Sequence, residues 1–349
     1  MKRSRIAVIG AGSWGTCLAR LLAERDHAVS LWCFEPELVE EMARAGENRL
    51  YLPGIPLPRA LKITSSLQEA CVEADLLLLA VPTQFMRGVL GRMRSCIERP
   101  VPIVSACKGI EQRTLTLPSQ IILEAFPDLK RTRVAVLSGP SFAKEVALSH
   151  PTAVSLACED YRLAVKIQRL FTASFFRLFL TTDLVGVQIG GALKNVIALA
   201  AGGSDGLGFG FNAKAALITR GLTEIMRLGL AMGAEPETFF GLSGVGDLVL
   251  TCTGQLSRNW QVGYQIGLGR TLPEVLKGMK MVAEGVETAR SARALSQKHG
   301  VEMPIVRQVY SVLFEEMPAR EAVLRLLEDA RGDEVPEEIH RYFGGAKRH

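Results

Sequence analysis

The sequence predicts a doubly wound, mostly parallel α/β domain followed by an all-helical domain. Two observations carry this prediction. Short apolar runs alternate with helical patterns over the first half of the chain, and after about residue 187 only long apolar or amphipathic helical stretches remain. The expected limits are 1–187 for the first domain, 188–332 for the second and 333–349 for a charged tail with few apolar anchors.

The strands of the first domain are expected to be short and buried. One run contains four consecutive leucines, which is typical of a parallel strand covered on both faces. The predicted strands are 6–9, 28–32, 75–81, 101–106 and 134–137, with a helix over about 14–25 after the first. The helices expected in the second domain are 191–201, 213–232, 272–278, 285–299 and 318–330.

Composition narrows the class of protein. The 349 residues suffice for two domains, and a net charge of +5 is too small to indicate nucleic acid, although it suits a small anionic substrate as well as an ordinary solvated surface. Seven cysteines without a C-x-x-C pair favour reduced thiols in a cytoplasmic protein, and five scattered histidines indicate no metal site. No apolar run reaches the roughly 18 residues of a membrane span.

The first motif is Gly10-Ala11-Gly12-Ser13-Trp14-Gly15, which lies between a predicted strand and a predicted helix. Glycines at this spacing permit a tight turn, close approach of a pyrophosphate and close packing of the helix on the strand. The helix N-terminus then offers free N–H groups to phosphate. The motif predicts a Rossmann-type dinucleotide site, and the alternative is a plain glycine-rich turn.

Glu35 bears on which dinucleotide is used. It lies twenty residues after Gly15, where an acidic side chain would bind the 2′-hydroxyl of NAD, and residues 28–43 contain no Lys or Arg for the 2′-phosphate of NADP. The alternative is that Glu35 is a surface acid at the start of the next helix. NAD is the expected cofactor, with NADP as the second possibility.

Two further motifs follow predicted strands of the first domain. Lys108 and the turn Ser138-Gly139-Pro140-Ser141-Phe142-Ala143 both come at strand ends, and ligands bind at the carboxyl edge of such sheets. A solvated lysine and a simple chain reversal are the alternatives.

Lys194 and Asn195 interrupt a strongly apolar helical stretch. A buried lysine is costly unless it has a partner or a task, and proton transfer is a task that suits it. The alternative is a lysine that snorkels from the helix surface.

Polar groups gather again in Gly246-Asp247-Leu248 and Ser257-Arg258-Asn259. An arginine flanked by neutral donors suits bidentate recognition of a phosphate, and two capped loops between helices are the alternative. The short turn Val282-Ala283-Glu284-Gly285 carries no signal by itself.

Taken together and in this order, these motifs resemble the glycerol-3-phosphate dehydrogenase family, in its bacterial NAD(P)-dependent branch, from about residue 5 to 330. The resemblance implies that Lys194 is the catalytic proton-transfer residue. It implies a substrate site for dihydroxyacetone phosphate or sn-glycerol 3-phosphate at Lys108, Gly139, Ser141, Lys194, Asn195, Asp247, Ser257, Arg258 and Asn259. It implies a cofactor site at Gly10, Gly12, Ser13, Trp14, Gly15, Phe34, Glu35, Phe85, Lys108, Ala143, Arg258, Val282 and Glu284.

The resemblance also implies a homodimer that supplies glycerophospholipid synthesis. Cys33, Phe34 and Glu35 stand where many bacterial members carry His or Arg. Phe34, Glu35 and Phe85 look more like the NAD-specific eukaryotic relatives, whose two phenylalanines flank the adenine side of NAD. Two rival functions remain at this point. One is a 2-hydroxy-acid or hydroxyacyl dehydrogenase of the same architecture, and the other is a module that senses NADH without turnover.

Overall fold

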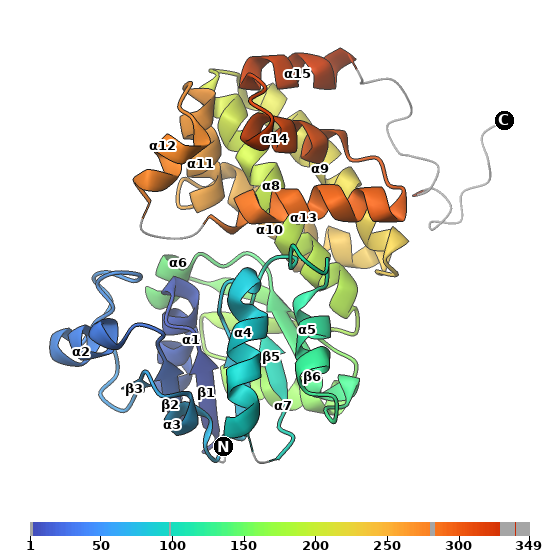
Figure 1. The fold of residues 1–349 in the computed structure, drawn as a ribbon. Helices are drawn as coiled ribbons and strands as arrows, with labels where there is room; N and C mark the ends of the chain where they lie inside the picture. The colour runs from blue at the N-terminus through green and yellow to red at the C-terminus, as the bar shows by residue number, and fades with distance from the viewer. Residues whose placement is uncertain (1–2, 98, 280–282, 329–338, 340–349) are drawn as a thin grey trace. The chain divides into compact units, whose positions relative to one another are not determined.

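In the computed structural model, residues 3–97, 99–279, 283–328 and 339 are described. They fall into two compact units (Figure 1). The first comprises Met1–Lys108 and Thr116–Leu184, and the second comprises Gly109–Leu115 and Val185–His349. The predicted tail, 333–349, lies outside the described residues except for Ile339.

The first unit is built on one eight-stranded sheet with the order β3-β2-β1-β4-β5-β6-β7-β8. Its neighbouring strands are parallel except for β6 and β7, which are antiparallel. The strands are β1 (Arg5–Ile9), β2 (Ala28–Trp32), β3 (Lys62–Thr64), β4 (Leu76–Leu79), β5 (Ile103–Ser105), β6 (Val134–Ser138), β7 (Thr152–Cys158) and β8 (Phe176–Thr181). The helices are α1 (Ser13–Ala23), α2 (Pro36–Ala45), α3 (Leu67–Cys71), α4 (Thr83–Met93), α5 (Pro118–Ala125), α6 (Ala143–Ala147) and α7 (Tyr161–Phe171), with short 3₁₀ turns η1 (Arg94–Cys96) and η2 (Arg131–Arg133).

The predicted doubly wound α/β class is confirmed, and so are its five predicted strands. Three strands, β3, β7 and β8, were not predicted from the sequence. β3 has only three residues, and β8 alternates buried and exposed side chains in its first four positions, so neither resembles the continuous apolar runs used to find the others. The reversal between β6 and β7 depends on the long-range pairing of Ala135–Ser138 with Ser155–Cys158, which local patterns do not specify.

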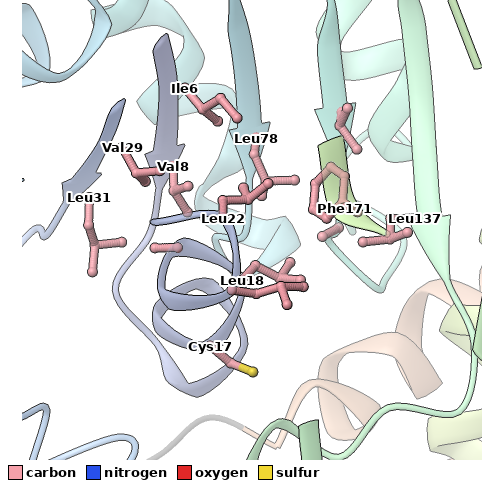
Figure 2. Close-up of a cluster of buried hydrophobic side chains, with 14 of the residues drawn as sticks. Ile6, Val8, Cys17, Leu18, Leu22, Val29, Leu31, Leu78, Leu137 and Phe171 are labelled. Atoms are coloured by element: carbon pink, nitrogen blue, oxygen red, sulfur yellow. The ribbon is translucent and has the colours of Figure 1, made fainter. Parts of the chain in front are cut away.

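The sheet is buried on both faces. Val8 of β1 and Leu78 of β4 belong to a cluster with Leu18 and Leu22 of α1 and Phe171 of α7 (Figure 2). Alternate strand residues point to opposite faces, so the neighbours of Leu78 face the other layer, where α4 packs against α5. This double cover leaves the ends of the strands as the places where polar side chains can gather.

Every regular element described in the second unit is a helix. Its elements are α8 (Leu184–Gly206), α9 (Phe211–Ala231), the 3₁₀ helix η3 (Pro236–Phe240), the π-helical turn η4 (Leu242–Gly246), α10 (Asp247–Thr253), α11 (Arg258–Gly267), α12 (Leu272–Lys277), α13 (Glu284–His299), α14 (Pro304–Phe314) and α15 (Ala319–Glu328). The five helices predicted here lie in α8, α9, α12, α13 and α15. The sequence analysis missed α10, α11 and α14.

Among the described residues, α8 alone has the length and apolar character to cross a membrane, with a mean hydropathy of 1.6 over its best window. Within this unit, 89% of that window is buried, as expected of a core helix.

Helices α8 and α11 approach each other backbone to backbone. A Cβ added at Gly202 would lie 2.0 Å from the carbonyl oxygen of Trp260, and one at Gly263 would lie 2.0 Å from that of Leu199. One at Gly267 would lie 2.4 Å from the carbonyl oxygen of Gly203. Only glycine permits this spacing, and it fixes α11 against α8.

The segment that follows Lys108 belongs to the second unit. The Ser291 hydroxyl of α13 donates to the carbonyl of Ile110 at 2.9 Å, and the Gln112 amide donates to the Glu287 carboxylate. No local pattern predicts that this segment belongs with the helices, because both contacts join residues more than 170 positions apart.

Glu224 of α9 caps α14 inside the second unit. Its carboxylate accepts the backbone N–H groups of Ile305 at 2.7 Å and Val306 at 3.2 Å. Burial raises the pKa of Glu224 to about 7, although these N–H groups oppose the rise. Since the folded pKa exceeds that of an unfolded glutamate, ionisation disfavours the fold as the pH rises from about 4.5 to about 7.

We therefore expect wild-type protein to lose up to about 3 kcal/mol of unfolding free energy between pH 4.5 and 8 relative to Glu224→Gln, which cannot ionise. Denaturant unfolding of both proteins across this range measures the difference. Glu302→Gln, which removes an exposed carboxylate near the same helix, is the control and should follow the wild-type curve. Parallel curves for wild type and Glu224→Gln would contradict the assignment.

Candidate active site

The glycine motif forms a turn between β1 and α1. Gly10 has φ +114°, and a Cβ there would lie 2.6 Å from the carbonyl oxygen of Ala80. A Cβ at Gly15 would lie 1.9 Å from the carbonyl oxygen of Gly10, whereas one at Gly12 would meet nothing within 4 Å. The first and third glycines are thus required by the fold, and the second leaves space beside the free N–H groups of the α1 N-terminus.

Three buried polar atoms at the carboxyl edge of this sheet have no hydrogen-bond partner among the described residues. They are Nε1 of Trp14, Oγ1 of Thr83 and Oγ of Ser138, which follow or end β1, β4 and β6. Buried polar atoms are nearly always paired in folded proteins, so an edge with three of them suits a polar ligand. The cradle at Gly12 and these atoms fit a dinucleotide.

Two exposed phenylalanines lie on either side of the glycine turn. Phe34 follows β2 and is 67% exposed, and Phe85 follows β4 and is 63% exposed. Phe34 lies two residues after β2, and Phe85 lies in the first turn of α4, which follows β4; both strands pair with β1. Large exposed aromatic side chains at such an edge offer apolar surface to a ligand such as adenine.

Glu35, next to Phe34, is the N-cap residue of α2. Its backbone position therefore agrees with the alternative interpretation, an acid at the start of a helix. Its carboxylate is also held in place. The Tyr51 hydroxyl donates to Oε1 and the Cys33 thiol donates to Oε2, both at 3.3 Å. Burial raises the pKa of the Cys33 thiol to about 12. Burial and the nearby Glu35 carboxylate also raise the pKa of Tyr51. Both donors therefore stay protonated at neutral pH.

Lys108, Gly139 and Ser141 meet at one carbonyl group. The Gly139 oxygen accepts from Lys108 Nζ at 3.2 Å and from the Ser141 hydroxyl at 2.9 Å. Gly139 has φ +139°, and a Cβ there would lie 2.9 Å from Cα of Val154, so only glycine fits this turn. Ala143, the last predicted residue of this unit, begins α6.

In the helical unit, Lys194 does not snorkel to the surface. Its side chain is 8% exposed and forms an ion pair with Asp247, which is fully buried. Asp247 begins α10, and the Thr251 hydroxyl one turn later donates to its main-chain oxygen at 2.6 Å. Gly190 of α8 makes the approach possible, because a Cβ there would lie 2.4 Å from the carbonyl oxygen of Ser243.

Asn195 and Asn259 both lie against Gly285 of α13. Gly285 donates its backbone N–H to Oδ1 of Asn259 at 2.9 Å, and a Cβ at Gly285 would lie 2.7 Å from the carbonyl oxygen of Asn195. Ser257 caps α11 by accepting the N–H of Trp260 at 3.2 Å, and half-buried Arg258 is the first residue of that helix.

Glu284 begins α13, and Val282 lies outside the described residues. The structure thus places Lys194 with Asp247, and Asn195 with Asn259, within one unit. Among the described residues it shows no group of three His, Cys, Asp or Glu that could hold a metal ion.

Family models cover nearly the whole chain. The model for the N-terminal part of NAD-dependent glycerol-3-phosphate dehydrogenase matches residues 5–164, and the model for its C-terminal part matches residues 183–324. The chain belongs to the NAD-dependent glycerol-3-phosphate dehydrogenase family. The resemblance inferred from the motifs is confirmed, and with it the expectation of an NAD(P)-dependent oxidoreductase.

Individual relatives support the same family. A glycerol-3-phosphate dehydrogenase [NAD(P)+] of Geobacter sp. (strain M21) is 56% identical over 93% of this chain and 96% of its own length. One of Bacillus pumilus is 48% identical over 98% and 99%. The crystal structure of glycerol-3-phosphate dehydrogenase from Coxiella burnetii, 39% identical, has a TM-score of 0.90 and covers 93% of this chain and 99% of its own.

Several residues around this family's motifs escaped the sequence analysis. Thr251 supports Asp247 from one turn away, and Tyr51 reaches Glu35 from a loop. Spacing along α10 could have suggested Thr251, since residues i and i+4 share a helix face. No local pattern could have suggested Tyr51.

Substitutions at Gly12 and Gly15 should separate an effect on cofactor binding from an effect on stability. Gly12→Ala should keep the wild-type Tm but weaken NADH binding by about tenfold or more, because the methyl group enters the space beside the helix N-terminus. Gly15→Ala should lower the Tm, because its methyl group meets the Gly10 carbonyl. Thermal unfolding and fluorescence titration with NADH measure the two effects. Wild-type NADH affinity in Gly12→Ala would show that NADH does not occupy the space beside Gly12.

Proposed function

We propose that this chain reduces dihydroxyacetone phosphate to sn-glycerol 3-phosphate with NADH, and that the reaction supplies glycerophospholipid synthesis in the cytoplasm. The observation that carries the proposal is the buried Lys194–Asp247 pair in a chain whose family membership spans both units. The proposal includes a homodimer, which is inferred from the family resemblance alone. The direct test is oxidation of NADH, followed by its absorbance, on addition of dihydroxyacetone phosphate.

Lys194 is proposed as the residue that moves the proton. When bound, the nicotinamide would supply the hydride for the carbonyl carbon of the substrate, and negative charge would develop on the carbonyl oxygen. The ammonium group of Lys194 donates a proton to that oxygen. Asp247 holds the ammonium in place and compensates its charge while it is buried.

The phosphate of the substrate is assigned to donors that include Arg258 and Asn259. An arginine in the first turn of a helix combines a planar fork with the free N–H groups of the helix end, and both suit an anion. Lys108, Gly139 and Ser141, which meet at the Gly139 carbonyl, are also proposed as substrate-binding residues. Binding energy from the phosphate orients the reacting carbon.

A substrate panel separates this function from its rivals. A 2-hydroxy-acid or hydroxyacyl dehydrogenase would act on an oxo acid or an acyl thioester and not on dihydroxyacetone phosphate. A sensor would bind NADH and turn over none of these substrates. Lys194 speaks against a sensor, because simple binding gives no reason to bury an ion pair, which is costly to desolvate.

Removing the ammonium tests the proposed proton transfer. Lys194→Met should lower kcat by roughly 10²–10⁴-fold. Because the single change removes the cation beside a buried carboxylate, the double variant Lys194→Met with Asp247→Asn restores neutrality and should fold with the same loss of kcat. NADH affinity should stay near the wild-type value in the double variant. Near-normal kcat in a folded variant would remove Lys194 from the mechanism.

Cofactor choice tests the role of Glu35. Its carboxylate, held by Tyr51 and Cys33, would accept the 2′-hydroxyl of NAD and repel the 2′-phosphate of NADP by roughly 1–4 kcal/mol. NADH should therefore exceed NADPH by about tenfold or more in kcat/KM. The double change Phe34→Arg with Glu35→Ser should reverse the order, measured at one low salt concentration because salt screens charge. Equal use of both cofactors by the parent would overturn this assignment.

A further inference from the structure

Asn48 is a fully buried amide in the irregular segment that follows α2. Its Nδ2 donates to the carbonyl oxygen of Ala11 at 2.8 Å and to the Thr16 hydroxyl at 2.9 Å. Its Oδ1 accepts the backbone N–H of Tyr51 at 3.0 Å. Both ends of this amide are therefore engaged, and one end holds the glycine turn from a loop more than thirty residues away in sequence.

The contact fixes the orientation of one peptide group in the turn. The Ala11 carbonyl accepts from Asn48 and also from the Thr16 hydroxyl, at 3.0 Å. In a trans peptide the C=O and the following N–H point in opposite directions. Two donors on the Ala11 oxygen therefore direct the N–H of Gly12 away from Asn48. On the other side, a Cβ at Gly12 would meet no atom within 4 Å.

The segment that carries Asn48 is itself firmly closed. Leu57 donates its backbone N–H to the carbonyl of Gly46 at 2.7 Å, and Glu47 and Pro56 form an isolated antiparallel bridge. The Glu47 carboxylate accepts the N–H of Gly54 at 3.0 Å. A closed loop of this kind can hold a distant turn in one position, because its own ends do not move apart.

The same loop reaches the second part of the cofactor site. Tyr51, three residues after Asn48, donates its hydroxyl to the Glu35 carboxylate. One segment thus holds both the turn assigned to the pyrophosphate and the acid assigned to the ribose. We propose that Asn48 is a positioning residue for dinucleotide binding, which presets the Gly12 N–H toward the pyrophosphate. The inference rests on the proposed cofactor site.

The test compares Asn48→Asp with wild type. This variant keeps the shape of the side chain and an acceptor for the Tyr51 N–H, but it loses the donors to Ala11 and places a carboxylate against that carbonyl. The dissociation constants of NADH and of ADP, measured by calorimetry on the ligand-free protein, should both rise by about tenfold or more. The kcat at saturating NADH should change less than threefold. Both ligands carry the pyrophosphate, so they should respond together.

Thr16 offers a matched pair of control variants. Thr16→Val removes the second donor to the Ala11 carbonyl, so it should weaken NADH and ADP binding, as Asn48→Asp does. Thr16→Ser keeps the hydroxyl and should bind both ligands with wild-type affinity. Tyr51→Phe leaves the Asn48 contacts intact and releases only the Glu35 carboxylate. It should lower the preference for NADH over NADPH, and its effect on ADP and NADH affinity, which both involve the 2′-hydroxyl, should be smaller than that of Asn48→Asp.

Two outcomes would overturn the proposal. One is wild-type affinity for NADH and ADP in folded Asn48→Asp. The other is a lowered Tm with an equal loss of kcat and of all binding, which is the signature of a purely structural amide. Failure of the proposed function itself looks different, since wild-type protein would then bind neither NADH nor ADP.

Discussion

An ammonium group inside a helical core needs a carboxylate beside it, and the pairing of Lys194 with Asp247 is the interaction that organises the second unit. The pair brings α8 to the start of α10, and Gly190 allows the approach by packing against the Ser243 carbonyl. Thr251 then supports the aspartate from the next turn. The position of the Lys194 ammonium and the packing of this region therefore depend on the same contact.

In the first unit, side-chain contacts fix the orientation of backbone peptide groups. A phosphate site made of backbone N–H groups works only if the peptide planes are fixed, and side chains from outside the turn supply that constraint. Ala11 receives two donors, and Gly10 and Gly15 close on each other without side chains between them. The conformation of the turn is therefore set by side-chain and backbone contacts from neighbouring residues.

Local patterns were sufficient for the doubly wound class, the glycine turn and the polar residues of α8, because each reflects a period or a spacing within a few residues. They were insufficient wherever the partner is distant in sequence. The Lys194–Asp247 contact spans 53 positions, and the contact of Asn48 with Ala11 spans 37. Contacts between residues distant in sequence also determine the antiparallel course of β7 and the placement of Gly109–Leu115 with the helices. The sequence analysis could name candidate residues, but tertiary packing decides which of them meet.

The glycines of α8 have a consequence for the order of folding. Six of its 23 residues are glycine, and each costs about 1 kcal/mol of helix propensity relative to alanine. An isolated α8 is therefore a poor helix, and its stability comes from the close backbone contacts with α11. The helix that carries Lys194 should form only when its neighbours are already in place. The buried ammonium would then be enclosed in the last steps of folding, when its carboxylate is already there to receive it.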